Sequence, residues 1–276
     1  MTRNIAILLL AAAPFAAGPA AAAQSQTYHI KFAPMVGSQP FRCGATYANF
    51  GRGRASITPE FFRFYVSQVR LLDAAGHKTP LHLEQDGVWQ RADVAFLSFE
   101  DAGSGCASGS PQKHEEIVGT APASHFTGIE FTIGVPEELD HADATIAASP
   151  LNLSDMFWSW QDGYKFFRFD TRVRDASGAS AAYIFHLGST GCTMSNNVAH
   201  CANLNRPTIG LTRFDPAKNV IVADLAAMYK NADVYALARG GGCMSNADDA
   251  CQPAMQDLGI AWGGKSAGPQ QLFSVR

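Results

Sequence analysis

The chain has 276 residues, 47% of them hydrophobic, and a formal net charge of −3. This length allows one large globular domain or two small ones, and no linker rich in Pro or Ser separates two cores. The mildly acidic charge argues against nucleic acid as the main partner, because binding it requires a basic face.

The N-terminus has the features of a secretory signal peptide. Arg3 supplies a positive start, residues 5–13 are apolar, and residues 21–23 form a small-residue cleavage site before Gln24. The apolar part is too short for a convincing transmembrane anchor. We therefore expect residues 1–23 to be removed and residues 24–276 to be one exported domain without a transmembrane segment.

Short runs in which apolar and polar residues alternate follow along the chain, and this period predicts β-strands. The runs are 28–32, 62–71, 129–135, 167–173, 183–187 and 220–222, and residues 94–99 are expected to form a further strand. In the second run the apolar face changes phase after Val66, which predicts a bulge near Ser67. Turn-forming clusters separate the runs, so we predict an all-β antiparallel sandwich with long loops. Asp93, Glu100 and Asp101 flank one strand and are expected at its rim.

Two short helices are predicted. Ser154 or Asp155 can cap a helix that runs through Gln161 and ends before Gly163. Asp224 can cap a second helix over residues 225–231.

An even number of cysteines in an exported protein favours disulfides. The six are Cys43, Cys106, Cys192, Cys201, Cys243 and Cys251. Cys192/Cys201 and Cys243/Cys251 are close pairs flanked by Gly, Ser and Asn, as expected of stapled loops, which leaves Cys43 to pair with Cys106. A zinc site is the alternative, although the chain has no Cys-x-x-Cys pair.

Two of the eight histidines differ from the rest. His186 occupies the polar phase of an otherwise apolar strand, and His141 follows a Val-Pro break and a carboxylate pair. Either alone is explained by a hydrogen bond to a backbone carbonyl, but together they suggest a metal site. Imidazole suits copper and zinc, and copper(I) accepts softer third ligands. By residue type the candidates for such a ligand are Met156, Met194 and Met244. The surface or loop histidines are expected to be His29, His77, His82, His114, His125 and His200.

Residues 156–167 concentrate aromatic side chains, with Trp158 and Trp160 two positions apart. On the predicted helix, Met156 and Trp160 share a face and Trp158 points the other way, so at most one tryptophan would face a metal site. Both rings filling the core is one alternative. Another is a secreted β-sandwich that binds a carbohydrate or small ligand through Trp158, Trp160 and Tyr164.

Other chemical motifs are missing. The chain has no Gly-x-Ser-x-Gly elbow, no His-Glu-x-x-His and no phosphate loop, which argues against a hydrolase. Asp248 and Asp249 could hold calcium, but they lack the spaced ligands of an EF-hand loop, so a solvated loop is favoured.

Several segments, in order along the chain, carry a resemblance to a known family. They include Phe41-Arg-Cys-Gly44, His186-Leu-Gly-Ser-Thr-Gly-Cys192, and the ranges 62–71, 134–136, 140–143, 149–152, 156–166, 205–207 and 242–245. On these residues the chain resembles the MbnP family, also described as metallo-mystery-pair four-Cys-motif proteins. The resemblance assigns Cys192, Cys201, Cys243 and Cys251 to the four-Cys motif.

The resemblance implies a periplasmic or surface-associated copper-binding protein that is not itself an enzyme. Its partner would be a di-haem, MauG-like peroxidase, MbnH, that oxidises a tryptophan to kynurenine. Related proteins bind copper(I) through two histidines and the kynurenine amine. Carried onto this chain, the ligands are His141 and His186, and the modified residue is Trp158 or Trp160. The chain departs from the family pattern at Asp140, where asparagine is expected.

Overall fold

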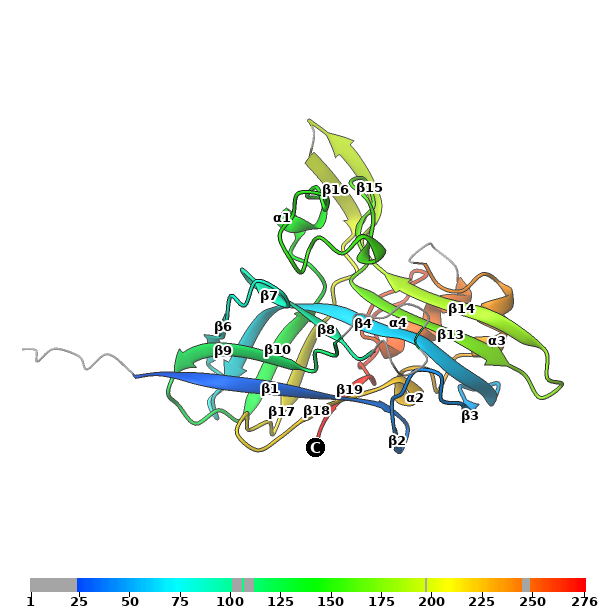
Figure 1. The fold of residues 1–276 in the computed structure, drawn as a ribbon, viewed down its shortest axis with the longest axis horizontal. Helices are drawn as coiled ribbons and strands as arrows, with labels where there is room; N and C mark the ends of the chain where they lie inside the picture. The colour runs from blue at the N-terminus through cyan, green and yellow to red at the C-terminus, as the bar shows by residue number, and fades with distance from the viewer. Residues whose placement is uncertain (1–23, 101–105, 107–111, 197, 245–248) are drawn as a thin grey trace, which may run out of the picture.

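The computed structural model describes residues 24–100, 106, 112–196, 198–244 and 249–276. The expected signal peptide and Asp101 lie outside these residues. Figure 1 shows long strands in two layers, with α2, α3 and α4 in the right half of the view, and a narrow two-stranded ribbon that projects upward near the middle of the long axis, with α1 beside it. None of the helices in the described part is long and apolar enough to cross a membrane.

The smaller sheet has the order β19-β18-β1-β9-β6, with β2 paired to β1. β1 pairs antiparallel with β9 and parallel with β18. Its strands are β1 (Ser25–Val36), β2 (Gln39–Pro40), β6 (His82–Leu83), β9 (Glu116–Pro122), β18 (Ile221–Asp224) and β19 (Phe273–Val275).

The larger sheet has the order β14-β13-β4-β10-β17 and is built around the long strand β4. Its strands are β3 (Tyr47–Phe50), β4 (Ala55–Leu72), β5 (Lys78–Pro80), β7 (Gln90–Arg91), β8 (Val94–Ser98), β10 (Gly128–Ile133), β13 (Phe167–Arg174), β14 (Ser180–Leu187) and β17 (Thr208–Thr212). β4 carries the predicted bulge: its register with β10 shifts beside Ser67, and Gln68 takes a φ of 54° there.

The remaining elements are short. Two hairpins stand apart from the sheets: β11 (Phe157–Ser159) with β12 (Gly163–Tyr164), and β15 (Thr190–Ser195) with β16 (Val198–Asn203). The helices are α1 (Glu137–Asp140), α2 (Leu225–Met228), α3 (Val234–Arg239) and α4 (Gln252–Asp257), and Ser154–Met156 and Asp249–Cys251 form 3₁₀ turns.

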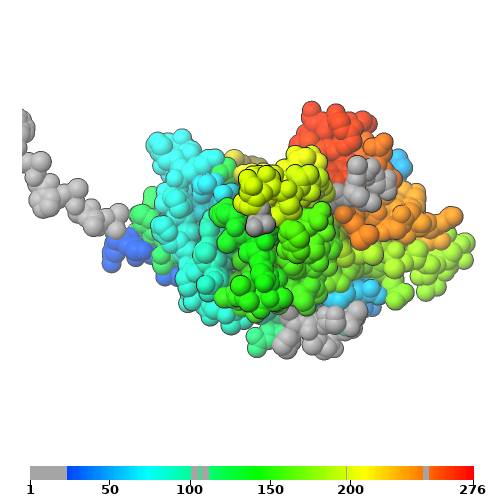
Figure 2. Space-filling view, turned by 90° about the horizontal axis from the view of Figure 1, so that it is seen from above, coloured from blue at the N-terminus to red at the C-terminus, as the bar shows by residue number. Residues whose placement is uncertain are grey.

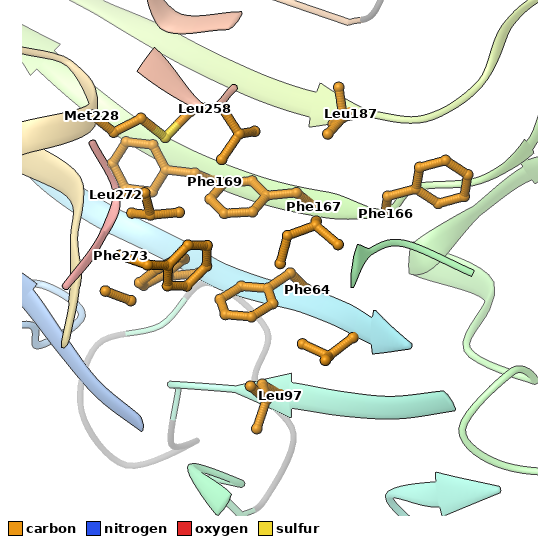
Figure 3. Close-up of a cluster of buried hydrophobic side chains, with 14 of the residues drawn as sticks. Phe64, Leu97, Phe166, Phe167, Phe169, Leu187, Met228, Leu258, Leu272 and Phe273 are labelled. Carbon is orange, nitrogen blue, oxygen red and sulfur yellow. The ribbon is translucent and has the colours of Figure 1, made fainter. Parts of the chain in front are cut away.

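Aromatic side chains fill the space between the two sheets. Phe32 of β1 meets Phe64 of β4 and Phe131 of β10 edge to face. Figure 3 shows Phe64 beside Phe167 and Phe273, and the rings of Phe64 and Phe167 stack with centroids 5.5 Å apart. This two-sheet core confirms the predicted all-β sandwich.

The predicted helix over residues 154–161 is wrong. Only one 3₁₀ turn forms, and the chain then makes the β11–β12 hairpin, with Phe157 opposite Tyr164. The hairpin turn is closed by Ser159, whose hydroxyl donates to the Asp162 carboxylate at 2.7 Å, and by Gly163 at a φ of 77°. Because the segment is not helical, Met156 and Trp160 do not share a helix face.

The second predicted helix exists but is shorter. The Asp224 side chain accepts from the Ala226 amide, as an N-cap should, and α2 ends at Met228 instead of Asn231. The chain turns after Tyr229, whose ring is buried against Phe50 and Phe169.

All six cysteines are paired, as Cys43–Cys106, Cys192–Cys201 and Cys243–Cys251. These are the pairs that the spacing favoured, so the alternative of a zinc site built on these cysteines does not hold for this oxidised form.

Candidate metal centre

The segments that carry the predicted site residues gather on one face of the molecule. Figure 1 shows α1 and the β15–β16 ribbon on its upper side, beyond the end of β14. Figure 2 looks onto this face, where the yellow ribbon residues lie directly against the green segment around residue 140 to 160. Stretches that are distant in sequence therefore form one surface here.

His186 is held at the end of β14 by a carboxylate. Its Nε2 lies 2.8 Å from Asp170 Oδ1, and its backbone amide donates to the Cys243 carbonyl at 2.8 Å. The side chain is only 10% exposed. Arg168 in turn donates from Nε to Asp170 Oδ2 at 2.8 Å. A histidine whose second nitrogen is bound to a carboxylate is typical of metal ligands, because the carboxylate fixes the ring and raises its basicity.

The charges behind His186 continue into the protein as a chain of ion pairs. Arg168 also contacts Asp155 at 3.2 Å, Asp155 accepts from Arg63 at 2.5 Å, and Arg63 pairs with Glu100. Glu100 is fully buried, so its expected place at the strand rim is wrong. Burial raises the pKa of Glu100, while the Arg63 guanidinium favours its charged form.

His141 follows α1 and is anchored by its other ring nitrogen. Nδ1 lies 2.9 Å from the backbone carbonyl of Trp160, and since a carbonyl can only accept, Nδ1 carries the proton. In the neutral ring, Nε2 then keeps its lone pair. Nε2 lies 3.2 Å from Cys201 Sγ and 3.4 Å from Asp140 Oδ2.

Asp140, the departure from the family pattern, is a buried acceptor. One carboxylate oxygen accepts from the Tyr164 amide and the other from the Ser189 hydroxyl, both at 2.8 Å. An asparagine has one acceptor oxygen and could satisfy only one of them. Burial raises the pKa of Asp140. A Cβ at Gly163 would lie 2.5 Å from this carboxylate, so the close approach requires glycine.

The two tryptophans have different environments. The Trp158 ring is partly buried, with its centroid 6.5 Å from that of the His186 ring, and it covers Gly188 so closely that a Cβ there would lie 2.5 Å away. Trp160 is 57% exposed, and its contact with the site is through its backbone carbonyl. Met156 is buried in the core.

Tyr164 cannot belong to a sugar-stacking platform. Its side chain is fully buried, its hydroxyl donates to the Leu151 carbonyl at 2.5 Å, and burial raises its pKa to about 12. The alternative of a platform made by Trp158, Trp160 and Tyr164 is therefore wrong in its third member.

A cleft of about 1130 Å³ opens beside Trp158. Its lining includes Trp158, Cys192, Met244, Trp262 and Lys265. Met244, one of the candidate soft ligands, is thus on the same cleft as Trp158, whereas Met194 lies on β15 of the ribbon.

Of the other six histidines, five are exposed as expected. His114 is not: its ring stacks on Trp89 with centroids 4.8 Å apart, and its Nδ1 lies 2.7 Å from the Phe96 carbonyl. Burial lowers the pKa of His114. Asp248, of the weak calcium candidate, lies outside the described residues.

Sequence reasoning missed the residues around the two histidines. Asp170 and Arg168 occupy the polar phase of β13, and Arg168 is directly opposite His186 in the register. If the two predicted strands had been paired with each other, the polar residues of one would have faced the histidine of the other. That juxtaposition would have indicated the residues around His186. The approach of Cys201 to His141 spans 60 positions and has no local signal.

The fold and these contacts define a disulfide-bonded all-β sandwich with two anchored histidines beside a tryptophan segment. The family model for MbnP matches residues 25–245. The solved structure of MbnP from Methylosinus trichosporium is similar, with 30% identity and a TM-score of 0.79, over 91% of this chain and 98% of that one. No curated protein matches the chain. The chain belongs to the MbnP family.

Proposed function

We propose that this protein is an exported, non-enzymatic copper-binding protein in which His141 and His186 hold copper(I). The main support is that each histidine has one ring nitrogen hydrogen-bonded to an oxygen: His141 to the Trp160 carbonyl and His186 to the Asp170 carboxylate. Both histidines also touch the tryptophan segment, His186 through the Trp158 ring.

The donor set fits the metal. With Nδ1 protonated against a carbonyl, His141 would bind through Nε2, and Asp170 would fix the His186 ring and raise its basicity as a ligand. Imidazole nitrogens suit copper, and copper(I) needs few ligands. When bound, copper would supply a redox-active, soft centre on this face of the molecule.

We further propose Trp158 as the residue that is oxidised to kynurenine. Its ring contacts His186, whereas the Trp160 ring points into solvent. An indole nitrogen is a poor ligand because its lone pair belongs to the ring. Oxidation would break the indole C2–C3 bond and leave one oxygen atom on each of these carbons, and hydrolysis would then release C2 as formate and leave an aryl amine that can bind metal. The oxidant would be two molecules of hydrogen peroxide, each reduced to water by a di-haem MauG-like partner of the MbnH type.

We also infer that residues 24–276 form one periplasmic domain after removal of the signal peptide. One cluster of buried side chains runs from Tyr28 to Phe273 and joins both sheets, which supports a single core.

Copper(I) titration tests the ligand assignment. His141→Ala and His186→Ala should each weaken binding by at least about tenfold, since even changes beyond the ligands cost that much. His82→Ala, on an exposed edge strand, should bind as the wild type does. If both ligand variants retain wild-type affinity, the assignment is wrong.

Intact mass after co-expression with a di-haem peroxidase of the MbnH type tests the modification. Wild type and Trp160→Phe should show the mass change from tryptophan to kynurenine, and Trp158→Phe should not. A change that persists in Trp158→Phe and disappears in Trp160→Phe would reverse the choice of residue.

A further inference from the structure

The Cys192–Cys201 disulfide lies against His141. The two cysteines are directly opposite each other on β15 and β16, and Cys201 Sγ lies 3.2 Å from His141 Nε2. A ring nitrogen of His141 and the two sulfur atoms all lie within 4.8 Å of one another. Nδ1 is held by the Trp160 carbonyl, so Nε2 is the nitrogen beside the sulfur pair, and Asp140 Oδ2 lies 3.4 Å from it.

This disulfide is the one in which both cysteines are partly exposed, and Cys192 lines the large cleft. In Cys43–Cys106 only Cys106 is partly exposed, and Cys243 and Cys251 are fully buried. Exposed disulfides are the ones that exchange most readily with external thiols.

We propose that reduction of Cys192–Cys201 creates a Cys₂His site for a soft or borderline metal ion, such as zinc(II) or copper(I), with His141 as the nitrogen ligand. An external dithiol supplies the two electrons: the S–S bond breaks, two thiols form, and the dithiol becomes a disulfide. Metal binding then releases the two thiol protons to solvent.

The geometry requires little rearrangement. Metal–sulfur bonds of about 2.3 Å and metal–nitrogen bonds of about 2.0 Å place tetrahedral ligand atoms roughly 3.5–3.8 Å apart. The observed 3.2 Å between Nε2 and Cys201 Sγ is already close to this, so the main change is separation of the two sulfurs. Three protein ligands leave one position open for water or a further ligand.

One consequence rests on the proposed function. His141 would serve both the two-histidine copper site and the Cys₂His site, so the two sites exclude each other. The oxidation state of Cys192–Cys201 would then decide whether His141 binds metal together with His186 or with the two thiolates.

The test uses the full mature protein and cobalt(II) as a spectroscopic probe. Mild dithiothreitol treatment, followed by alkylation and mass spectrometry, should label Cys192 and Cys201 before the four other cysteines. Cobalt(II) added to the reduced protein should give a thiolate-to-cobalt charge-transfer band that zinc(II) removes. The oxidised protein should give no such band.

Variants separate the ligands. Cys192→Ser/Cys201→Ser should lose the band, and His141→Ala, which leaves the disulfide intact, should weaken cobalt binding at least about tenfold after reduction. His200→Ala is the matched control, because this exposed histidine precedes Cys201 on the same strand. It should behave as the wild type does.

His186→Ala distinguishes this proposal from the proposed function, since it should lose tight copper(I) binding in the oxidised protein and keep the cobalt band in the reduced one. The proposal is overturned if reduced wild type gives no band. It is equally overturned if His141→Ala binds cobalt as tightly as the wild type, or if the disulfide is reduced only when the protein unfolds.

Discussion

At the scale of single residues, the carboxylate of Asp170 determines how His186 presents its ring. It accepts from His186 at 2.8 Å and is itself held by Arg168. Asp170→Asn keeps the size of the side chain but removes its charge. We expect copper(I) affinity to fall about 10- to 100-fold, as for other groups that orient a histidine ligand.

The control for this prediction is Arg172→Ala, on the same strand, where the arginine is 66% exposed and pairs with Glu60. It should leave the affinity unchanged. If Asp170→Asn also left the copper(I) affinity unchanged, Asp170 would not orient His186 for copper binding.

A second prediction concerns pH. The pKa of His114 is lowered by burial, so the folded state binds its proton less readily than the unfolded state does. The free energy of unfolding therefore keeps its full value above the pKa of histidine in the unfolded chain, about 6.5. It decreases as the pH falls from there through the lower pKa of His114 in the folded protein. His114→Phe retains a ring against Trp89 and should flatten the dependence of the free energy of unfolding on pH in this window, measured by urea denaturation. An unaltered slope would contradict the assignment.

At the scale of elements, the end of β14 places His186, the proposed ligand, beside Trp158. His186 lies on this strand, and two residues further on Gly188 lies under the Trp158 ring of β11. A methyl group at position 188 would meet the ring at 2.5 Å and the Tyr164 carbonyl at 2.6 Å. The hairpin can approach β14 this closely only because residue 188 is glycine.

Gly188→Ala should therefore lower the free energy of unfolding by about 1–3 kcal/mol, the usual cost of overpacking, and shift the tryptophan fluorescence. It should also slow kynurenine formation. Gly210→Ala on β17, where a Cβ would meet nothing within 4 Å, is the control and should change stability by less than about 0.5 kcal/mol. Equal effects of the two substitutions would contradict the packing argument.

At the scale of the whole molecule, the disulfides should differ in how much they stabilise the fold. Cys43–Cys106 closes a separation of 63 residues and Cys192–Cys201 one of 9. Loop-closure entropy gives about 4 kcal/mol for the first and about 3 kcal/mol for the second. Urea unfolding of Cys43→Ala/Cys106→Ala and Cys192→Ser/Cys201→Ser should show the larger loss in the first variant. If the second variant lost more stability, contacts of the disulfides in the folded state would outweigh the loop-closure entropy of the unfolded chain.

The sandwich was predictable because its signals are local. Alternation along residues 167–173 and 183–187 predicted β13 and β14, and the phase change after Val66 predicted the bulge in β4. The hairpin at 157–164 was not predictable in this way. A possible N-cap at Ser154 or Asp155 favoured a helix locally, whereas burial of Met156 and Tyr164 and the turn at Gly163 favour the hairpin.

The sequence alone determined the strands, the Asp224 cap, the disulfide pairs and the two unusual histidines, because each depends on residue type and spacing within a short stretch or on simple pairing of cysteines. The tertiary structure decided which groups meet: Asp170 with His186, Trp158 with Gly188, and Cys201 with His141. These contacts join residues up to 60 positions apart. They depend on how strands pair and where the hairpins pack, which no local pattern encodes.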